Sequence, residues 1–233
     1  MTDTPLSPAA VAGLIDHTLL KADASEETVR RTAQEALDHQ FASACINPRW
    51  VRMVAELLRG SRVRTCTVVG FPLGATTTAA KVAETDEAVF NGASEIDMVV
   101  DVADANAGLE TEVQAQIDAV ARAAHDGGAI LKVILETALL TENAKRLVCR
   151  AAEAAGADFV KTSTGFAGGG AAVEDIVLMH QEVGGRLGIK ASGGVRTYED
   201  AAKMLAAGAT RLGASASLDI VGAENNGSAE NAY

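Results

Sequence analysis

The chain has 233 residues, a formal net charge of −11 and 48% hydrophobic residues. This length suits one large domain with a sizeable core. A strongly acidic chain repels nucleic acid and anionic membranes, so the charge argues against both as partners. An anionic substrate would therefore need a locally basic site.

The cysteines and the N-terminus indicate a cytoplasmic protein. Cys45, Cys66 and Cys149 are odd in number and lack the spacing of metal ligands, which is typical of reduced thiols. Residues 1–8 lack the basic region and apolar run of a signal peptide. No apolar run approaches the length of a membrane span.

Strand-like and helix-like runs alternate along the chain, with Ser25 and Thr141 as expected helix caps and glycines as expected helix ends. In chain order we expect strand 14–20, helix 25–40, strand 43–46, helix 48–58, strand 64–69, helix 77–91, strand 95–101 and helix 109–125. There follow strand 130–135, helix 141–155, strand 159–163, helix 172–183, strand 189–192, helix 197–207 and strand 210–213.

Eight strands that alternate with helices predict an α/β fold, a (β/α)₈ TIM barrel. A doubly wound open sheet is the competing fold, but no G-x-G-x-x-G follows the first strand. No linker or change in composition divides the chain. We therefore expect a single domain over residues 1–233, with a flexible polar tail over about 222–233.

Lys161 lies inside a buried strand-like run, within the segment 158–166. An unpaired buried charge is costly, so this lysine must pair with a carboxylate or lose its proton. A neutral lysine is a nucleophile that forms a Schiff base with a carbonyl group. For one isolated lysine, a side chain that reaches from the strand end to water is the alternative.

Lys132 and Lys190 occupy the same kind of place in two other apolar runs. Burial and neighbouring cations both lower the pKa of a lysine. Three lysines in neighbouring buried strands are therefore expected to produce a neutral amine near neutral pH.

Asp97 and Asp16 are the carboxylates expected near these lysines. A carboxylate inside a barrel needs a cation, so a structural ion pair and a catalytic role both remain open for each. Cys45 either lines the site or is a small buried side chain. No grouping of His, Cys and carboxylates has the spacing of a metal site, so we expect no metal and no cofactor.

Glycine-rich turns follow the seventh and eighth expected strands, at Gly193-Gly194 and at Gly213 to Ser215. The loops after these strands commonly bind phosphate in TIM barrels, through backbone N–H groups. Glycine lets the backbone approach the phosphate oxygens closely. The position of these turns therefore predicts a phosphate site.

Five motifs together resemble the deoxyribose-phosphate aldolase family, in order and over about residues 14–216. They are IDHTLLK at 15–21, VGFPLG at 69–74, EIDMV at 95–99, FVKTSTGF at 159–166 and KASGGVR at 190–196. The resemblance implies a class I aldolase that reversibly cleaves 2-deoxy-D-ribose 5-phosphate to D-glyceraldehyde 3-phosphate and acetaldehyde. It also implies a place in deoxyribonucleoside catabolism.

The same resemblance implies roles for individual residues. Lys161 would form the Schiff base, Lys190 would favour its neutral form, and Lys190 and Asp97 would move protons. The C-terminal Tyr233 would relay a proton if the tail folds over the site; the alternative is a tail without a role. The implied supporting residues are Asp16, Lys132, Cys45 and Thr164, and the implied phosphate-binding residues are Gly165, Gly193, Gly194, Gly213 and Ser215.

Two positions depart from the family pattern. Asp101 stands where Asn is frequent and adds negative charge, and Ala216 stands where a second Ser often helps to bind phosphate. Two other functions stay open from the residues: a different Schiff-base lyase or transaldolase, and a non-catalytic sugar-phosphate-binding protein. The expected partners are sugar phosphate and aldehyde substrates, and a homodimer or homotetramer is left open.

Overall fold

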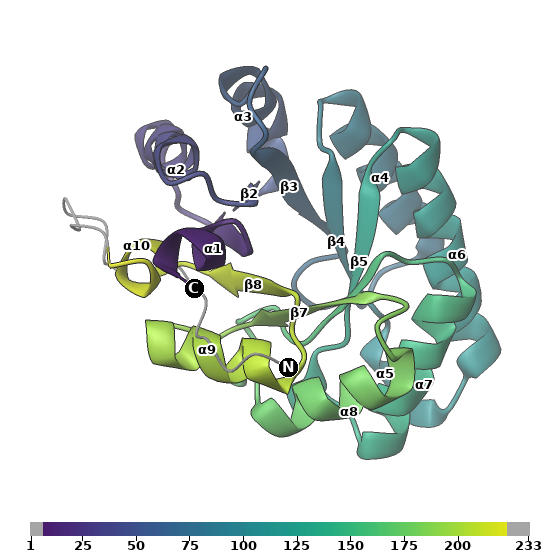
Figure 1. Ribbon diagram of the computed structural model, residues 1–233. Helices are drawn as coiled ribbons and strands as arrows, with labels where there is room; N and C mark the ends of the chain where they lie inside the picture. The colour runs from purple at the N-terminus through teal and green to yellow at the C-terminus, as the bar shows by residue number, and fades with distance from the viewer. Residues whose placement is uncertain (1–6, 223–233) are drawn as a thin grey trace.

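The computed structural model describes residues 7–222, which form a closed barrel of eight parallel strands in chain order (Figure 1). The first strand pairs with both the second and the eighth, which closes the barrel. The predicted TIM barrel is thereby confirmed. The strands are β1 (Ile15–Leu19), β2 (Ser43–Ile46), β3 (Arg64–Val69), β4 (Glu95–Val99), β5 (Ile130–Ile134), β6 (Phe159–Lys161), β7 (Gly188–Ser192) and β8 (Arg211–Ala214).

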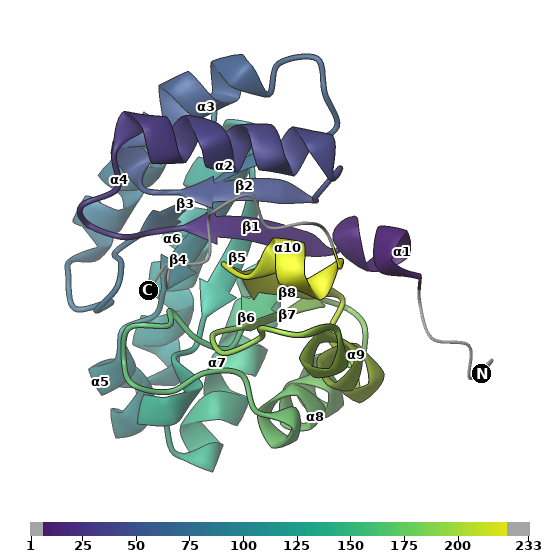
Figure 2. The ribbon, with the colours of Figure 1, turned by 90° about the vertical axis from the view of Figure 1, so that its left-hand side faces the viewer.

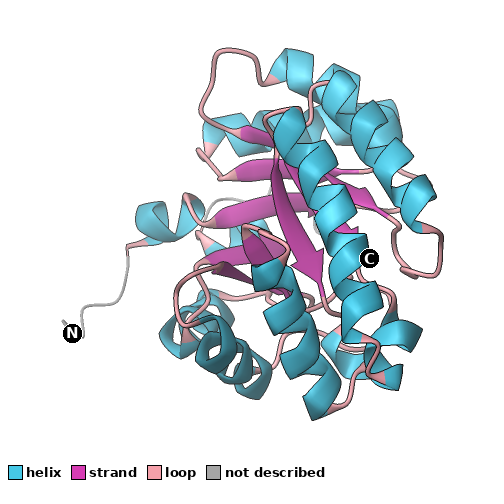
Figure 3. Cartoon of the chain, turned by 90° about the vertical axis from the view of Figure 1, so that its right-hand side faces the viewer, coloured by secondary structure: helices cyan, strands magenta, loops and turns pink. Residues whose placement is uncertain are grey.

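Helices surround the strands (Figure 3). Several begin where the sequence places a capping side chain: the Ser25 hydroxyl accepts the Thr28 N–H at 3.2 Å, and Thr197 forms a capping box with Asp200. The helices are α1 (Pro8–Ala12), α2 (Glu26–Asp38), η1 (Pro48–Trp50), α3 (Val51–Leu57), α4 (Thr78–Phe90), α5 (Val102–Ala107), α6 (Glu110–Asp126), η2 (Thr137–Leu139), α7 (Glu142–Ala154), α8 (Val173–Val183), α9 (Tyr198–Ala207) and α10 (Ser217–Ile220).

The hydrophobic core lies between the strands and the surrounding helices. Ile15, Ile96, Leu131 and Val160 on the strands and Val29 on α2 are all buried in it. The alternate strand residues point into the barrel, and these inward positions hold the charged side chains. In Figure 2, α1 lies at the end where β1 begins and α5 lies at the opposite end.

The structure differs from the expected elements near the fourth and sixth strands. β4 ends at Val99, not at residue 101, because Asp101 starts α5, a helix that the sequence analysis missed. The Asp101 carboxylate accepts the Ala103 and Asp104 N–H groups at 3.0 and 3.1 Å. The residue that departs from the family pattern therefore has a local role as a helix cap.

β6 ends at Lys161, two residues before the expected end. The tail from residue 223, including Tyr233, lies outside the described residues. Within residues 7–222, no helix has the length and apolar character needed to cross a membrane.

Candidate active site

Three lysines converge on one carboxylate inside the barrel. Lys161 Nζ and Lys190 Nζ lie 2.8 and 2.7 Å from the same oxygen of Asp97, Oδ2, and Lys132 Nζ lies 2.8 Å from the other oxygen, Oδ1. The strand register places Asp97 beside Lys132 and Lys161 beside Lys190. All four residues are at most 2% exposed. The four residues that the sequence analysis placed near one another therefore do meet.

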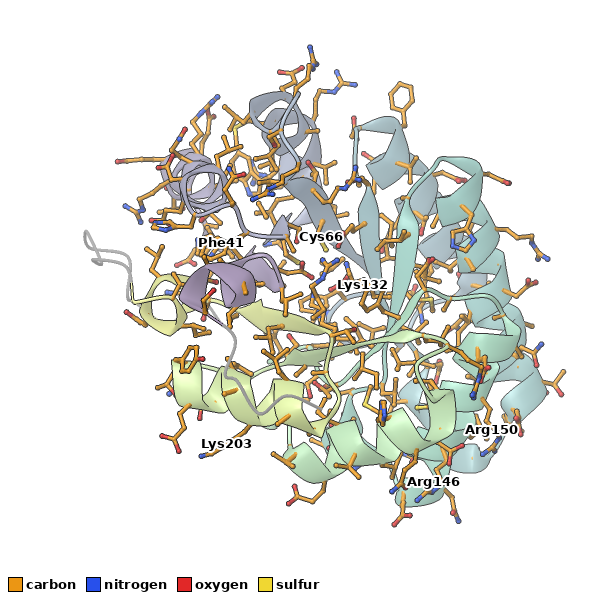
Figure 4. All side chains as sticks on the ribbon, viewed as in Figure 1. Phe41, Cys66, Lys132, Arg146, Arg150 and Lys203 are labelled. Carbon is orange, nitrogen blue, oxygen red and sulfur yellow. The ribbon has the colours of Figure 1, made fainter. Side chains whose placement is uncertain are left out.

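Figure 4 shows where the basic side chains lie. Lys132 and Cys66 lie within the ring of strands, whereas Arg146, Arg150 and Lys203 project from the outer helices. The exposed basic groups form pairs such as Lys203 with Glu199 at 2.9 Å. The inward lysines differ from these exposed groups in two ways: they are buried, and they share one carboxylate, Asp97.

A second layer of ion pairs lies nearer to the strand starts. Arg211 Nη1 contacts Asp16 Oδ1 at 2.6 Å and Glu95 Oε2 at 3.1 Å. Asp16 Oδ2 contacts Lys190 Nζ at 2.5 Å, and Glu95 Oε2 contacts Lys132 Nζ at 2.6 Å. Glu95 and Arg211 are the first residues of β4 and β8. This second layer therefore lies closer to the strand starts than Asp97 does, and its carboxylates contact Lys132 and Lys190.

The carboxylates determine the protonation of two of the lysines. Burial alone would lower the pKa of Lys190, but Asp16 and Asp97 outweigh it and raise that pKa well above its ordinary value. Asp97, with Glu95 and Asp16, likewise outweighs burial at Lys132 and raises its pKa. Lys132 lowers the pKa of Lys190, as expected for a neighbouring cation, but the carboxylates outweigh this effect, and both side chains are cations at neutral pH.

The same contacts hold the carboxylates ionised. Burial alone would raise the pKa of Asp97, but Lys132, Lys161 and Lys190 hold it well below its ordinary value. Lys190, Lys132 and Arg211 do the same for the pKa of Asp16. Buried charges of both signs are thus retained because each has partners of the opposite sign.

The opposite side of the barrel interior is apolar. Leu20, Cys45, Cys66 and Val68 form a buried cluster, and Phe71 packs against it. These residues come from β1 to β3 and the segments that follow β1 and β3, whereas the lysines come from β5 to β7. An apolar wall and a charged wall therefore adjoin each other at Cys66.

Two thiols adjoin the charged wall. Cys45 and Cys66 are register partners on β2 and β3, and with Asp97 they bring three donor atoms within 4.8 Å of one another. Sequence spacing does not reveal this grouping. However, the Lys132 ammonium lies 3.5 Å from Cys66 Sγ and 2.8 Å from Asp97 Oδ1, so the protein itself supplies the cation. Cys66 and Asp97 of this group therefore lie against a protein cation.

The segment after β6 is held by Glu136, which lies between β5 and η2. Glu136 has a left-handed backbone, with φ of 58°, and its carboxylate accepts hydrogen bonds from the Thr164 N–H and hydroxyl. The Thr164 hydroxyl oxygen in turn accepts the Phe166 N–H at 3.0 Å. A strained residue that holds a buried loop beside Lys161 is typical of a functional site.

The expected phosphate-binding residues lie on three adjacent segments. Gly165 follows β6, Gly193 and Gly194 follow β7, and Ser215 follows β8. Gly193 must be glycine because a Cβ there would lie 2.9 Å from the Cα of Gly170. This close approach brings the segments after β6 and β7 together.

Gly213 lies inside β8 and makes room for the charged wall. A Cβ at Gly213 would lie 2.9 Å from Lys190 Cε and 2.6 Å from Ser192 Oγ. Packing against Lys190 and Ser192 therefore favours glycine at this position, whether or not Gly213 also binds a phosphate.

Known proteins are similar to this chain in sequence and fold. A family model described as the DeoC/LacD family aldolase matches residues 10–227. The chain belongs to the DeoC/LacD aldolase family. It is accordingly a lyase that acts on a carbon–carbon bond.

Individual relatives of this aldolase match along nearly their whole length. A deoxyribose-phosphate aldolase of Bacillus cereus (strain Q1) is 53% identical over 95% of this chain and 99% of its own. Deoxyribose-phosphate aldolase 2 of Bacillus licheniformis is 53% identical over 92% of this chain and 96% of its own. The tetrameric deoxyribose phosphate aldolase structure from Aeropyrum pernix superposes with a TM-score of 0.86 at 33% identity, over 93% of this chain and 91% of that chain.

The sequence analysis of this aldolase missed Arg211 and did not assign a role to Glu95 or Cys66. Arg211 lies in an expected strand, and inward alternation was the available signal. His17 has a partner at each ring nitrogen: these nitrogens lie 2.9 Å from Ser217 Oγ and 2.8 Å from Glu35 Oε2.

Proposed function

We propose that this aldolase reversibly cleaves 2-deoxy-D-ribose 5-phosphate to D-glyceraldehyde 3-phosphate and acetaldehyde, with Lys161 as the Schiff-base lysine. The observation that carries the proposal is that Lys161 and Lys190 share one oxygen of Asp97. Lys190 has a second carboxylate, Asp16, and Lys161 has none within ion-pair distance among residues 7–222. Lys161 is thus the lysine that can act as a neutral amine. The names of the relatives support the choice of substrate.

The reaction follows from the groups that surround Lys161. The neutral amine attacks C1 of the open-chain sugar, and Asp97 and Lys190 transfer the protons that allow water to leave the carbinolamine. The resulting iminium accepts the electron pair as the C2–C3 bond breaks and the C3 hydroxyl loses its proton. This releases D-glyceraldehyde 3-phosphate and leaves an enamine. Protonation of the enamine carbon and addition of water then release acetaldehyde and restore Lys161.

Both walls of the barrel interior suit this substrate. The apolar cluster of Leu20, Cys45 and Val68 offers a surface for the two-carbon fragment. Backbone N–H groups at Gly165, Gly193, Gly194, Gly213 and Ser215 would bind the phosphate, and Thr164 would support that segment. Such loops are the usual phosphate site of a TIM barrel. We place the reaction in deoxyribonucleoside catabolism, with Tyr233 as a proton relay.

Reductive trapping tests the assignment. Incubation with acetaldehyde and cyanoborohydride should leave an ethyl group on Lys161, detected by peptide mass spectrometry, and the protein should release acetaldehyde from 2-deoxyribose 5-phosphate. Lys161→Arg should lose both the adduct and the turnover, whereas Lys81→Arg, at a buried lysine outside the barrel, should retain both. An adduct on Lys132 or Lys190 would refute the assignment. Phosphate binding without any adduct would indicate a non-catalytic binding protein.

A further inference from the structure

The buried ionisable groups of the barrel interior are unequal in number. The basic groups are Arg211, Lys132, Lys190 and Lys161, and the carboxylates that contact them are Asp16, Glu95 and Asp97. If every group were charged, the interior would hold one positive charge in excess. An uncompensated buried charge is costly, so loss of one proton is the least costly way to remove the excess.

The four basic groups differ in the number of carboxylates that they contact, and the group with the fewest is the one expected to lose its proton. Lys190 touches Asp16 and Asp97, and Lys132 touches Glu95 and Asp97, all within 2.8 Å. Arg211 cannot be deprotonated in a protein. Among residues 7–222, Lys161 pairs only with the Asp97 oxygen that it shares with Lys190. Lys161 is therefore the basic group with the fewest carboxylate contacts in this cluster.

We propose that Arg211 is a positioning residue for the Schiff-base chemistry: it occupies Asp16 and Glu95, and so leaves Lys161 as the one basic group without a carboxylate of its own. Arg211 lies at the start of β8, its side chain is 15% exposed, and its guanidinium lies 5.3 Å from the ring of Phe159. Arg211 is linked to Lys161 through Asp16, Lys190 and Asp97, each in contact with the next. This inference rests on the proposed function.

Two thiols and one further carboxylate also lie near this cluster. Cys66 adjoins Asp97, and burial raises the pKa of its thiol, which keeps it neutral. Cys45 is its neighbour, and its hydrogen bond to Cys66 lowers the pKa of the Cys45 thiol. The Glu136 carboxylate accepts hydrogen bonds from Thr164. Within residues 7–222, it forms no ion pair with the four basic groups.

The prediction concerns the pH at which Lys161 becomes reactive. Arg211→Met leaves three lysines with three carboxylates, so Lys161 keeps its proton to higher pH. The midpoint of acetaldehyde trapping should rise by roughly one pH unit, which slows trapping below the midpoint about tenfold. Arg211→Lys should leave the midpoint near that of the parent, because a single nitrogen, Nη1, makes both contacts.

A compensating substitution separates this role from a general structural one. Glu95→Gln removes one carboxylate, so the double variant Arg211→Met/Glu95→Gln again has one more basic group than carboxylates. Its midpoint should return toward the parent value, although three ion pairs have been lost: Arg211 with Asp16, Arg211 with Glu95, and Lys132 with Glu95. Glu95→Gln alone should move the midpoint to lower pH.

The experiment measures cyanoborohydride trapping of acetaldehyde on Lys161 across pH, with thermal unfolding as the check that each variant is folded. The proposal is overturned if folded Arg211→Met has the parent midpoint, or if the double variant lies further from the parent than the single one. If Arg211→Met does not fold, Glu95→Gln decides, and an unchanged midpoint overturns the proposal. Absence of trapping at Lys161 in the parent would instead refute the proposed function itself.

Discussion

Lys190 and Lys81 are both completely buried, yet their surroundings shift their pKa values in opposite directions. Lys190 lies inside the barrel against Asp16 and Asp97, which raise its pKa despite burial. Lys81 lies on α4, and its Nζ donates to the Val99 carbonyl at 2.7 Å and to Gln116 Oε1 at 2.8 Å. Burial lowers the pKa of Lys81 from 10.5 to about 8. Burial alone therefore does not set protonation; a contacting carboxylate reverses its effect.

The largest test of this comparison removes the shared carboxylate. Asp97→Asn leaves Lys132, Lys161 and Lys190 without their common negative partner. Breaking a buried ion pair in this way costs about 3–5 kcal/mol of unfolding free energy. Loss of a proton-transferring group should also lower turnover by about 10²–10⁴-fold.

Urea unfolding and an acetaldehyde-release assay measure the two effects of Asp97→Asn. Glu142→Gln is the matched control, because Glu142 pairs with Arg146 on the surface, with side chains 69% and 31% exposed. A surface pair contributes about 0–1 kcal/mol. Equal destabilisation by the two substitutions would contradict the central place given to Asp97.

A second test removes the lysine that lacks a contacting carboxylate. Between pH 8 and 10.5 unfolded Lys81 holds a proton that folded Lys81 has lost, so the stability of the parent rises with pH in this window. Below pH 8 both states are protonated and the penalty for burying the charge is fully present. Relative to Lys81→Met, the parent should gain about 3 kcal/mol across the window. Urea unfolding at several pH values measures this gain, and a flat difference would contradict it.

A third and smaller test gives Lys81 a contacting carboxylate, as Lys190 has. Gln116→Glu places a carboxylate at 2.8 Å from Lys81 Nζ without changing the shape of the side chain. A contacting opposite charge raises a lysine pKa by roughly 1–3, so the stability gain between pH 8 and 10.5 should shrink by about 1–3 kcal/mol. The same unfolding series measures it. An undiminished gain would show that the contact does not govern Lys81.

The sequence predicted the barrel and most of its charged wall because both depend on local pattern. Apolar runs and glycine ends located the strands, and the FVKTSTGF motif located Lys161. Short α5 was missed because its six residues follow directly on an apolar strand. Arg211 was missed because its partners lie 195 and 116 residues away, in strands whose register no local pattern specifies. The raised pKa values of Lys132 and Lys190 were missed for the same reason, since they depend on contacts between strands.

The protonation of individual lysines tests the account most directly. Nuclear magnetic resonance of ¹³Cε-labelled lysine, assigned with single Lys→Arg variants, reports the charge of each side chain across pH. Lys81 should titrate near pH 8, whereas Lys132 and Lys190 should remain charged there and above. Lys161 should give the signal of a neutral amine in the pH range where acetaldehyde is trapped. A charged Lys161 in that range, or a Lys190 that titrates together with Lys81, would contradict the account.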